Sequence, residues 1–175
     1  MDLHDFESTD LYFDEACPPL VDGLLAEAAE GYASGEAELP LLRAYFLAPQ
    51  QLSVLVGLYR FYFYQHRLGD ADQVAVRAME IAGQRLGFPD DWQRVSTVAL
   101  GVAVQRSMGL VRFWLMCLKA RAILALREQR LDVAGQMLQA LRGLDECDRL
   151  GVQPLLDLLE STRAATAEEA LAEAA

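Results

Sequence analysis

The sequence is short of cysteine, of long apolar runs and of basic residues at its start, and each shortage excludes a class of protein. Three cysteines without a CxxC pair predict neither a disulfide framework nor a zinc knuckle. The opening MDLHDFESTDLYF lacks the basic and apolar regions of a secretory signal. The most apolar stretch, 108–126, is interrupted by Arg112, Lys119 and Arg121, whereas a membrane span needs roughly 20 apolar residues. We therefore expect a soluble protein of the reducing cytoplasm, with no membrane partner.

Positive charge is absent from the first quarter of the chain. Residues 1–42 hold 11 acidic residues and no lysine or arginine. Residues 43–142 hold 13 basic and 7 acidic residues, and residues 143–175 hold 2 basic and 8 acidic residues. The formal net charge of -11 argues against nucleic acid as a partner. The basic middle is either an ordinary solvated surface or a site for an acidic segment, from a partner or from the chain itself.

Helical signals cover almost the whole chain, and no alternating strand pattern competes with them. Asp70 with Gln73, and Asp90 with Gln93, have the spacing of a capping box, so a helix is expected to begin at each aspartate. Gly69 is expected to close the helix before the first of these. Prolines and apolar spacing then divide the chain into helices over 19–33, 41–47, 49–68, 70–86, 90–104, 108–127 and 132–144, with another helical pair after them.

These signals predict an all-α protein with one folded domain. We expect the helical domain to span residues 17–160. An acidic segment rich in aromatic residues, 1–16, precedes it, and an acidic tail rich in alanine, 161–175, follows it.

Two stretches share one pattern: LYRFYFYQHRLGDADQVAVRAMEIA and LMCLKARAILALREQRLDVAGQMLQAL. Each has a long apolar helix, an Arg-Leu turn with an aspartate, and a second helix with an early alanine. The pattern resembles the tetratricopeptide (TPR) class of repeats, in which antiparallel helical hairpins stack as a short solenoid. Taking Ala75 and Ala134 as equivalent separates the two units by 59 residues, which departs from the usual repeat of about 34. A generic helical bundle is the alternative.

A further stretch, LPLLRAYFLAPQQLSVLVGLYRFYFYQHRL, resembles short bacterial helical-repeat proteins from nitrogen-fixation gene clusters. This resemblance implies an accessory role in nitrogenase assembly or regulation. It transfers no functional residue.

The TPR-like register predicts which side chains line the inner groove of the solenoid. Most of these side chains are cationic, and arginine suits the bidentate binding of carboxylates. We therefore expect the groove to bind an acidic peptide or protein surface. The alternative is that these are ordinary exposed side chains. The predicted partner-binding residues are Arg60, Tyr64, Arg67, Lys119 and Arg127.

The sequence contains few candidates for catalytic residues. Its two histidines, His4 and His66, are not placed beside a nucleophile, and no glycine-rich phosphate motif is present. We therefore expect no enzyme, no cofactor and no metal. The favoured function is a non-enzymatic adaptor or accessory factor that binds another protein through an acidic segment. The alternatives are a homo-oligomeric structural subunit, such as a homodimer, an enzyme with an unrecognised site, and a groove occupied by the chain's own segment 1–16.

Overall fold

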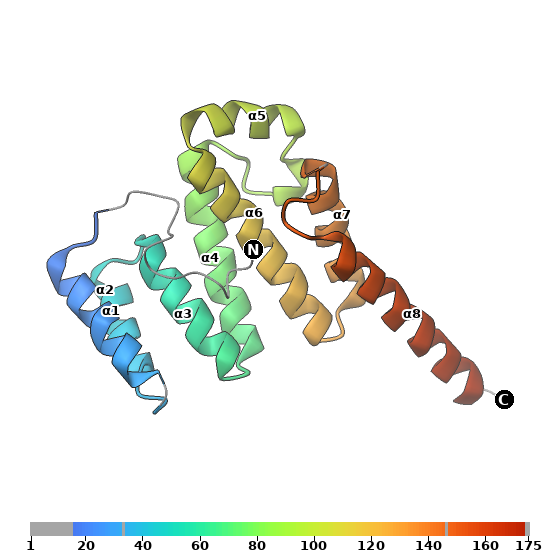
Figure 1. Cartoon of the computed structure of the whole chain (residues 1–175), viewed down its shortest axis with the longest axis horizontal. Helices are drawn as coiled ribbons and strands as arrows, with labels where there is room; N and C mark the ends of the chain where they lie inside the picture. Colours follow the sequence, from blue (N-terminus) through green and yellow to red (C-terminus); the bar gives the residue numbers. More distant parts are fainter. Residues whose placement is uncertain (1–15, 33, 146, 174–175) are drawn as a thin grey trace.

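The computed structural model describes residues 16–32, 34–145 and 147–173. Over these ranges the protein is all-helical, as predicted, with eight α-helices, one short 3-10 helix and no strand (Figure 1). The elements, in chain order, are α1 (Pro19–Gly31), α2 (Glu38–Leu47), α3 (Leu52–Tyr64), α4 (Leu68–Leu86), η2 (Trp92–Arg94), α5 (Thr97–Arg106), α6 (Met108–Arg127), α7 (Leu131–Leu144) and α8 (Gln153–Glu173).

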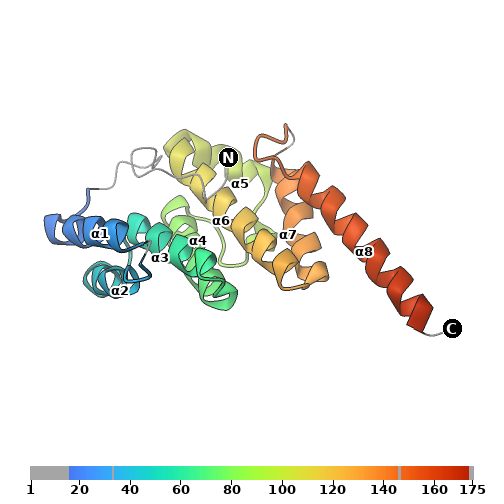
Figure 2. The same cartoon turned by 60° about the horizontal axis from the view of Figure 1, so that its bottom comes forward.

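The helices form a row of hairpins. The pairs α1–α2, α3–α4 and α6–α7 are packed hairpins, α4 packs on α6 to join the second pair to the third, and α8 packs on α7. Figures 1 and 2 show α1 and α2 at one end of the row and α8 at the other. This arrangement is consistent with the predicted solenoid of helical hairpins. The helix α5 lies beside α6 and α7, outside the simple row.

The core of the row is centred on α6. Every residue over 113–120 is buried, as expected for a helix that is apolar on all sides. Trp114 meets Phe88 edge-on, with 5.1 Å between ring centroids. In α3, Tyr59 and Phe61 are also buried. Burial of these aromatic side chains makes α3, α4 and α6 the packed centre of the molecule.

The two central hairpins turn in the same way. His66 and Gln129 both have a left-handed backbone, with φ of 57° and 58°. The following amide, of Arg67 or Arg130, donates to the carbonyl five residues earlier, at 2.9 and 2.8 Å, which is a helix-ending motif. The turns therefore place the two hairpins 63 residues apart, from His66 to Gln129.

This spacing corrects the expected spacing of 59. At 63 residues, Ala134 corresponds to Ala71 and not to Ala75, and Ala71 and Ala134 are both fully buried. The predicted register was wrong by four residues, about one helical turn. The error arose because several small residues follow each turn, and only the backbone of the turn shows which of them are equivalent.

The predicted capping boxes do not begin the helices. The helix α4 begins at Leu68, so Gly69 lies in its first turn, and the Asp70 carboxylate accepts a hydrogen bond from Nε of Arg67 at 2.7 Å. Asp91, not Asp90, caps the short helix η2. Ser96 then caps α5 through its hydroxyl, which accepts from the amide of Ala99 at 3.2 Å.

The end of the chain also differs from expectation. One helix, α8, stands where a helical pair was expected, and it runs unbroken past residue 160, where the tail was expected to begin. Of the predicted segment 1–16, only Ala16 lies within the described residues.

Candidate interaction surfaces

The turns of the two central hairpins lie side by side. Nη2 of Arg127 is 3.2 Å from Nδ1 of His66, and the Arg127 guanidinium lies 4.8 Å from the ring centroid of Phe63. Tyr64 is half-exposed beside them. Two of the predicted partner-binding residues, Tyr64 and Arg127, therefore do come together at an exposed end of the molecule.

Arg67 is neutralised within the chain. Its guanidinium pairs with Glu38 and with Asp70, each at 2.7 Å, and lies 4.4 Å from the ring centroid of Tyr62. Glu38 belongs to the acidic first quarter of the chain. Arg67 therefore pairs with one acidic residue from the first quarter of the chain.

Lys119, the only lysine in the chain, is buried and does not line an open groove. Its ammonium group donates a hydrogen bond of 2.7 Å to the carbonyl of Leu150. At the true spacing of 63 residues Lys119 corresponds to Val56, which is also buried. The prediction placed Lys119 one helical turn too close to the hairpin turn, and the expectation that Lys119 lines an open groove was therefore wrong. In the structure it anchors the segment before α8.

Arg60 is half-buried near the junction of α1 and α3. There the Tyr32 hydroxyl donates to the carbonyl of Gly57 at 2.8 Å. Burial raises the pKa of Tyr32 to about 12, and the Arg60 guanidinium partly opposes this rise. The five predicted residues thus lie in different surroundings: Tyr64 and Arg127 at an exposed turn, Arg67 in ion pairs within the chain, Arg60 half-buried and Lys119 buried. They do not form one continuous cationic groove.

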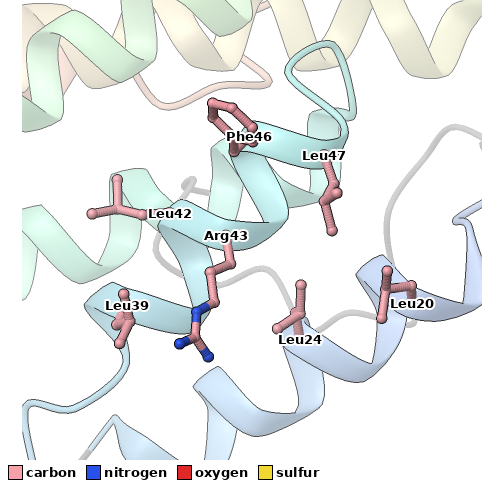
Figure 3. A pocket seen from close by; sticks show the side chains of 7 residues that line it. All are labelled: Leu20, Leu24, Leu39, Leu42, Arg43, Phe46 and Leu47. Carbon is pink, nitrogen blue, oxygen red and sulfur yellow. The ribbon is translucent and has the colours of Figure 1, made fainter.

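An exposed apolar surface lies elsewhere, on the hairpin of α1 and α2. A groove of about 500 Å³ runs between the two helices (Figure 3). Phe46 at its edge is 88% exposed, and four leucines of the groove are 41% to 67% exposed: Leu20, Leu39, Leu42 and Leu47. We call this surface the α1–α2 face; it consists of Leu20, Leu24, Leu39, Leu42, Arg43, Phe46 and Leu47.

The α1–α2 face exists because α2 is apolar on two opposite sides. Leu41 and Ala44 are buried on the inner side, where a Cβ at Gly57 would lie 2.8 Å from Leu41. Leu39 and Phe46 lie on the outer side, as helical spacing requires. Sequence reasoning missed this face, although the signal was present. The segment ELPLLRAYFL is too apolar for a helix with one solvated side.

Arg43 is the single charged residue that lines the groove. Figure 3 shows its side chain extending between Leu39 and Leu24. Arg43 is exposed, and it has no hydrogen bond or ion pair to any residue that the structure describes. An unpaired cation inside an apolar surface is suited to a carboxylate from a bound partner.

A second apolar hollow, of about 370 Å³, lies between α5, α6 and the segment that precedes α8. Leu100, Val104 and Met108 line it, with Arg149 among its few polar residues. Within the described ranges no three His, Cys, Asp or Glu side chains could hold a metal ion together, and His4 lies outside those ranges. No helix in the same ranges has the length and apolarity needed to cross a bilayer.

The chain is 48% identical over 159 residues to the uncharacterized 19.8 kDa protein of the nifW 5′ region in Azotobacter chroococcum mcd 1, a match that covers 91% of this chain and 89% of that protein. The chain belongs to the same family as that protein. The resemblance to proteins of nitrogen-fixation clusters is confirmed at this level. No family model matches the chain, and no solved structure matches it significantly, so membership of the tetratricopeptide class is not confirmed.

Proposed function

We propose that this protein is a non-enzymatic interaction module that serves nitrogen fixation as an accessory factor, and that the α1–α2 face binds its protein partner. The observation that carries the proposal is the exposed apolar groove around Phe46. A soluble protein rarely leaves a continuous patch of this kind open unless it binds another surface. A few large side chains, aromatic ones among them, contribute most of the binding free energy at such interfaces.

The relative from Azotobacter chroococcum supports the setting of this function. That protein is encoded beside nifW, and the two chains match over nearly their whole lengths. We infer that the family works with the products of nitrogen-fixation genes. An accessory role in the assembly or regulation of nitrogenase fits a small chain with an exposed apolar face.

The groove indicates what kind of surface binds there. Leucines from both helices line its walls, so the partner offers apolar side chains from a helix. Arg43 lies within the groove without a partner of its own among the described residues, so the bound surface also carries a carboxylate. We therefore assign the predicted preference for an acidic partner to Arg43 and not to the TPR-like groove.

The exposed turn is a second candidate surface for an acidic segment. Arg127 is held against Phe63 and His66, and it forms no ion pair with a carboxylate in the described part of the chain. Binding at Arg127 and Tyr64 would weaken with salt, because an exposed ion pair is screened over about 8 Å at physiological ionic strength. Arg127→Glu would then abolish binding, whereas Arg43→Glu would leave it unchanged.

Affinity capture tests the proposal. Tagged wild-type protein, Phe46→Glu and Val98→Glu are each incubated with extract of Azotobacter chroococcum grown without fixed nitrogen. Val98 is 76% exposed on α5, so Val98→Glu makes the same chemical change outside the α1–α2 face. We expect wild type and Val98→Glu to retain the same proteins and Phe46→Glu to lose them. Equal capture by all three would contradict the assignment of the face.

A further inference from the structure

We infer that the partner of the α1–α2 face is a second copy of this chain, so that two molecules associate through the same face about a two-fold axis. The inference rests on the proposed function, because it names the occupant of that binding face. Three observations carry it: the open end of the hairpin row, the charges on the face, and the charge of the competing segment of the chain.

The two ends of the hairpin row differ. At the end formed by α8, Leu159 is buried against Gly135 of α7, while Asp157 and Glu160 point to solvent, next to a half-exposed Leu158. A polar outer side of this kind is what closes a solenoid. The opposite end, formed by α1 and α2 (Figure 2), has no such closure in the described residues, because Leu39 and Phe46 make the outer side of α2 apolar (Figure 3). It presents a surface on which another helical hairpin would stack.

A second copy supplies that hairpin with matching charges. Arg43 is the cation in the groove, and Glu27 stands one turn beyond Leu24 on α1, at the spacing that keeps it on the same side of the helix. Glu27 is exposed. An isologous interface brings each patch against its own copy, so each Arg43 can meet the Glu27 of the other molecule. Glu27 lies beside the seven residues that line the groove, and it offers a carboxylate to the Arg43 of the other copy.

The chain's own first residues are a poorer occupant. Residues 1–15, which lie outside the described ranges, contain six acidic residues and no lysine or arginine. Placing them on the face would oppose six carboxylates to the single Arg43, beside Glu27. Like charges brought together in this way oppose binding. Charge therefore disfavours the segment in cis as the occupant of the face.

Sedimentation velocity of the full chain over a dilution series tests the inference. The face consists of seven residues, whereas a stable interface uses about 20–30 residues on each side, so we expect a dimer that dissociates on dilution. Phe46→Glu should raise its dissociation constant about 30-fold or more. Val98→Glu should leave it unchanged. Circular dichroism of each variant confirms that the helices remain folded.

Exchanging the charges of Arg43 and Glu27 tests the predicted ion pair more specifically than Phe46→Glu does. Arg43→Glu alone and Glu27→Arg alone should each weaken the dimer about 10-fold, because each places like charges together. The double variant should restore the wild-type constant. A wild-type protein that is monomeric at every concentration would overturn the inference, as would a dimer that is indifferent to Phe46→Glu or a double variant without rescue. A monomer that still captures another protein through Phe46 would leave the proposed function standing without this occupant.

Discussion

His66 and Gln129 occupy the same place in two successive hairpins, 63 residues apart in the chain, and each turns the backbone with a φ near 58°. Neither residue is a glycine, although a left-handed backbone costs a residue with a side chain roughly 1 kcal/mol or more. The left-handed conformation persists because the helices on both sides of the turn are packed into the core. The equivalence of the two turns defines the register of the whole molecule.

Gln129→Gly should stabilise the protein by about 0.5–1 kcal/mol, because glycine adopts a positive φ without steric cost. The matched control is Gln139→Gly in the interior of α7, where glycine should instead cost about 1 kcal/mol. Chemical denaturation of the three proteins measures both changes in the free energy of unfolding. A loss of stability in both variants would show that the turn is not strained.

Two glycines in helices should respond in opposite directions to alanine. A Cβ at Gly57 would lie 2.8 Å from Cδ2 of Leu41, and Leu41 is buried, so Gly57→Ala should push α2 away from α3 and cost about 1–3 kcal/mol. A Cβ at Gly101 in α5 would meet nothing within 4 Å. Gly101→Ala should therefore stabilise the protein by about 0.5–1 kcal/mol. Thermal unfolding of both variants measures the sign of each change in stability. A Gly57→Ala variant as stable as the wild type would mean that α2 packs only loosely on α3.

Lys119 should act as a structural anchor and not as a binding residue. Lys119→Ala removes both the buried stem and the hydrogen bond to Leu150, and we expect it to cost about 1–3 kcal/mol. Lys119→Met keeps an apolar stem of similar length, so its cost should be smaller. Hydrogen exchange should quicken over 147–152 in both variants. Unchanged exchange there would contradict the anchoring role.

The cysteines should differ in reactivity. Burial raises the pKa of the Cys117 thiol, with the charge of Arg121 opposing the rise only in part, and Cys117 is fully buried. Cys147 is exposed. A thiolate is the reactive species, so a thiol reagent at neutral pH should modify Cys147 in the folded protein and reach Cys117 only on unfolding. Mass spectrometry of the labelled peptides measures this, and early modification of Cys117 would mean that α6 opens readily.

The fold could be predicted to a large extent from the sequence, because apolar helices joined at Gln-His-Arg-Leu and Glu-Gln-Arg-Leu leave few arrangements other than hairpins. Helix starts were less predictable. Asp70 and Asp90 have the spacing of capping residues, but tertiary packing begins α4 at Leu68 and caps the later helices at Asp91 and Ser96. Local spacing shows which residues could cap a helix, and tertiary packing determines which of them does so.

The candidate site could be predicted only in part. Tyr64 and Arg127 both contact Phe63. Because the predicted register was wrong by one helical turn, Lys119 was expected to line a groove and is instead buried. Arg67 was predicted to be available, and its partner Glu38 lies 29 residues away in the chain, which no local pattern reveals. The α1–α2 face was overlooked because a short apolar helix is ordinarily a buried one.

The most direct test of the central claim is nitrogenase activity in Azotobacter chroococcum. The gene of the relative in the nifW 5′ region is deleted, and the strain is supplied with this chain as wild type, Phe46→Glu or Val98→Glu. Acetylene reduction is then measured during growth without fixed nitrogen. We predict that activity falls in the deletion strain, and that wild type and Val98→Glu restore it while Phe46→Glu does not. A deletion without any loss of activity, or full restoration by Phe46→Glu, would contradict the account.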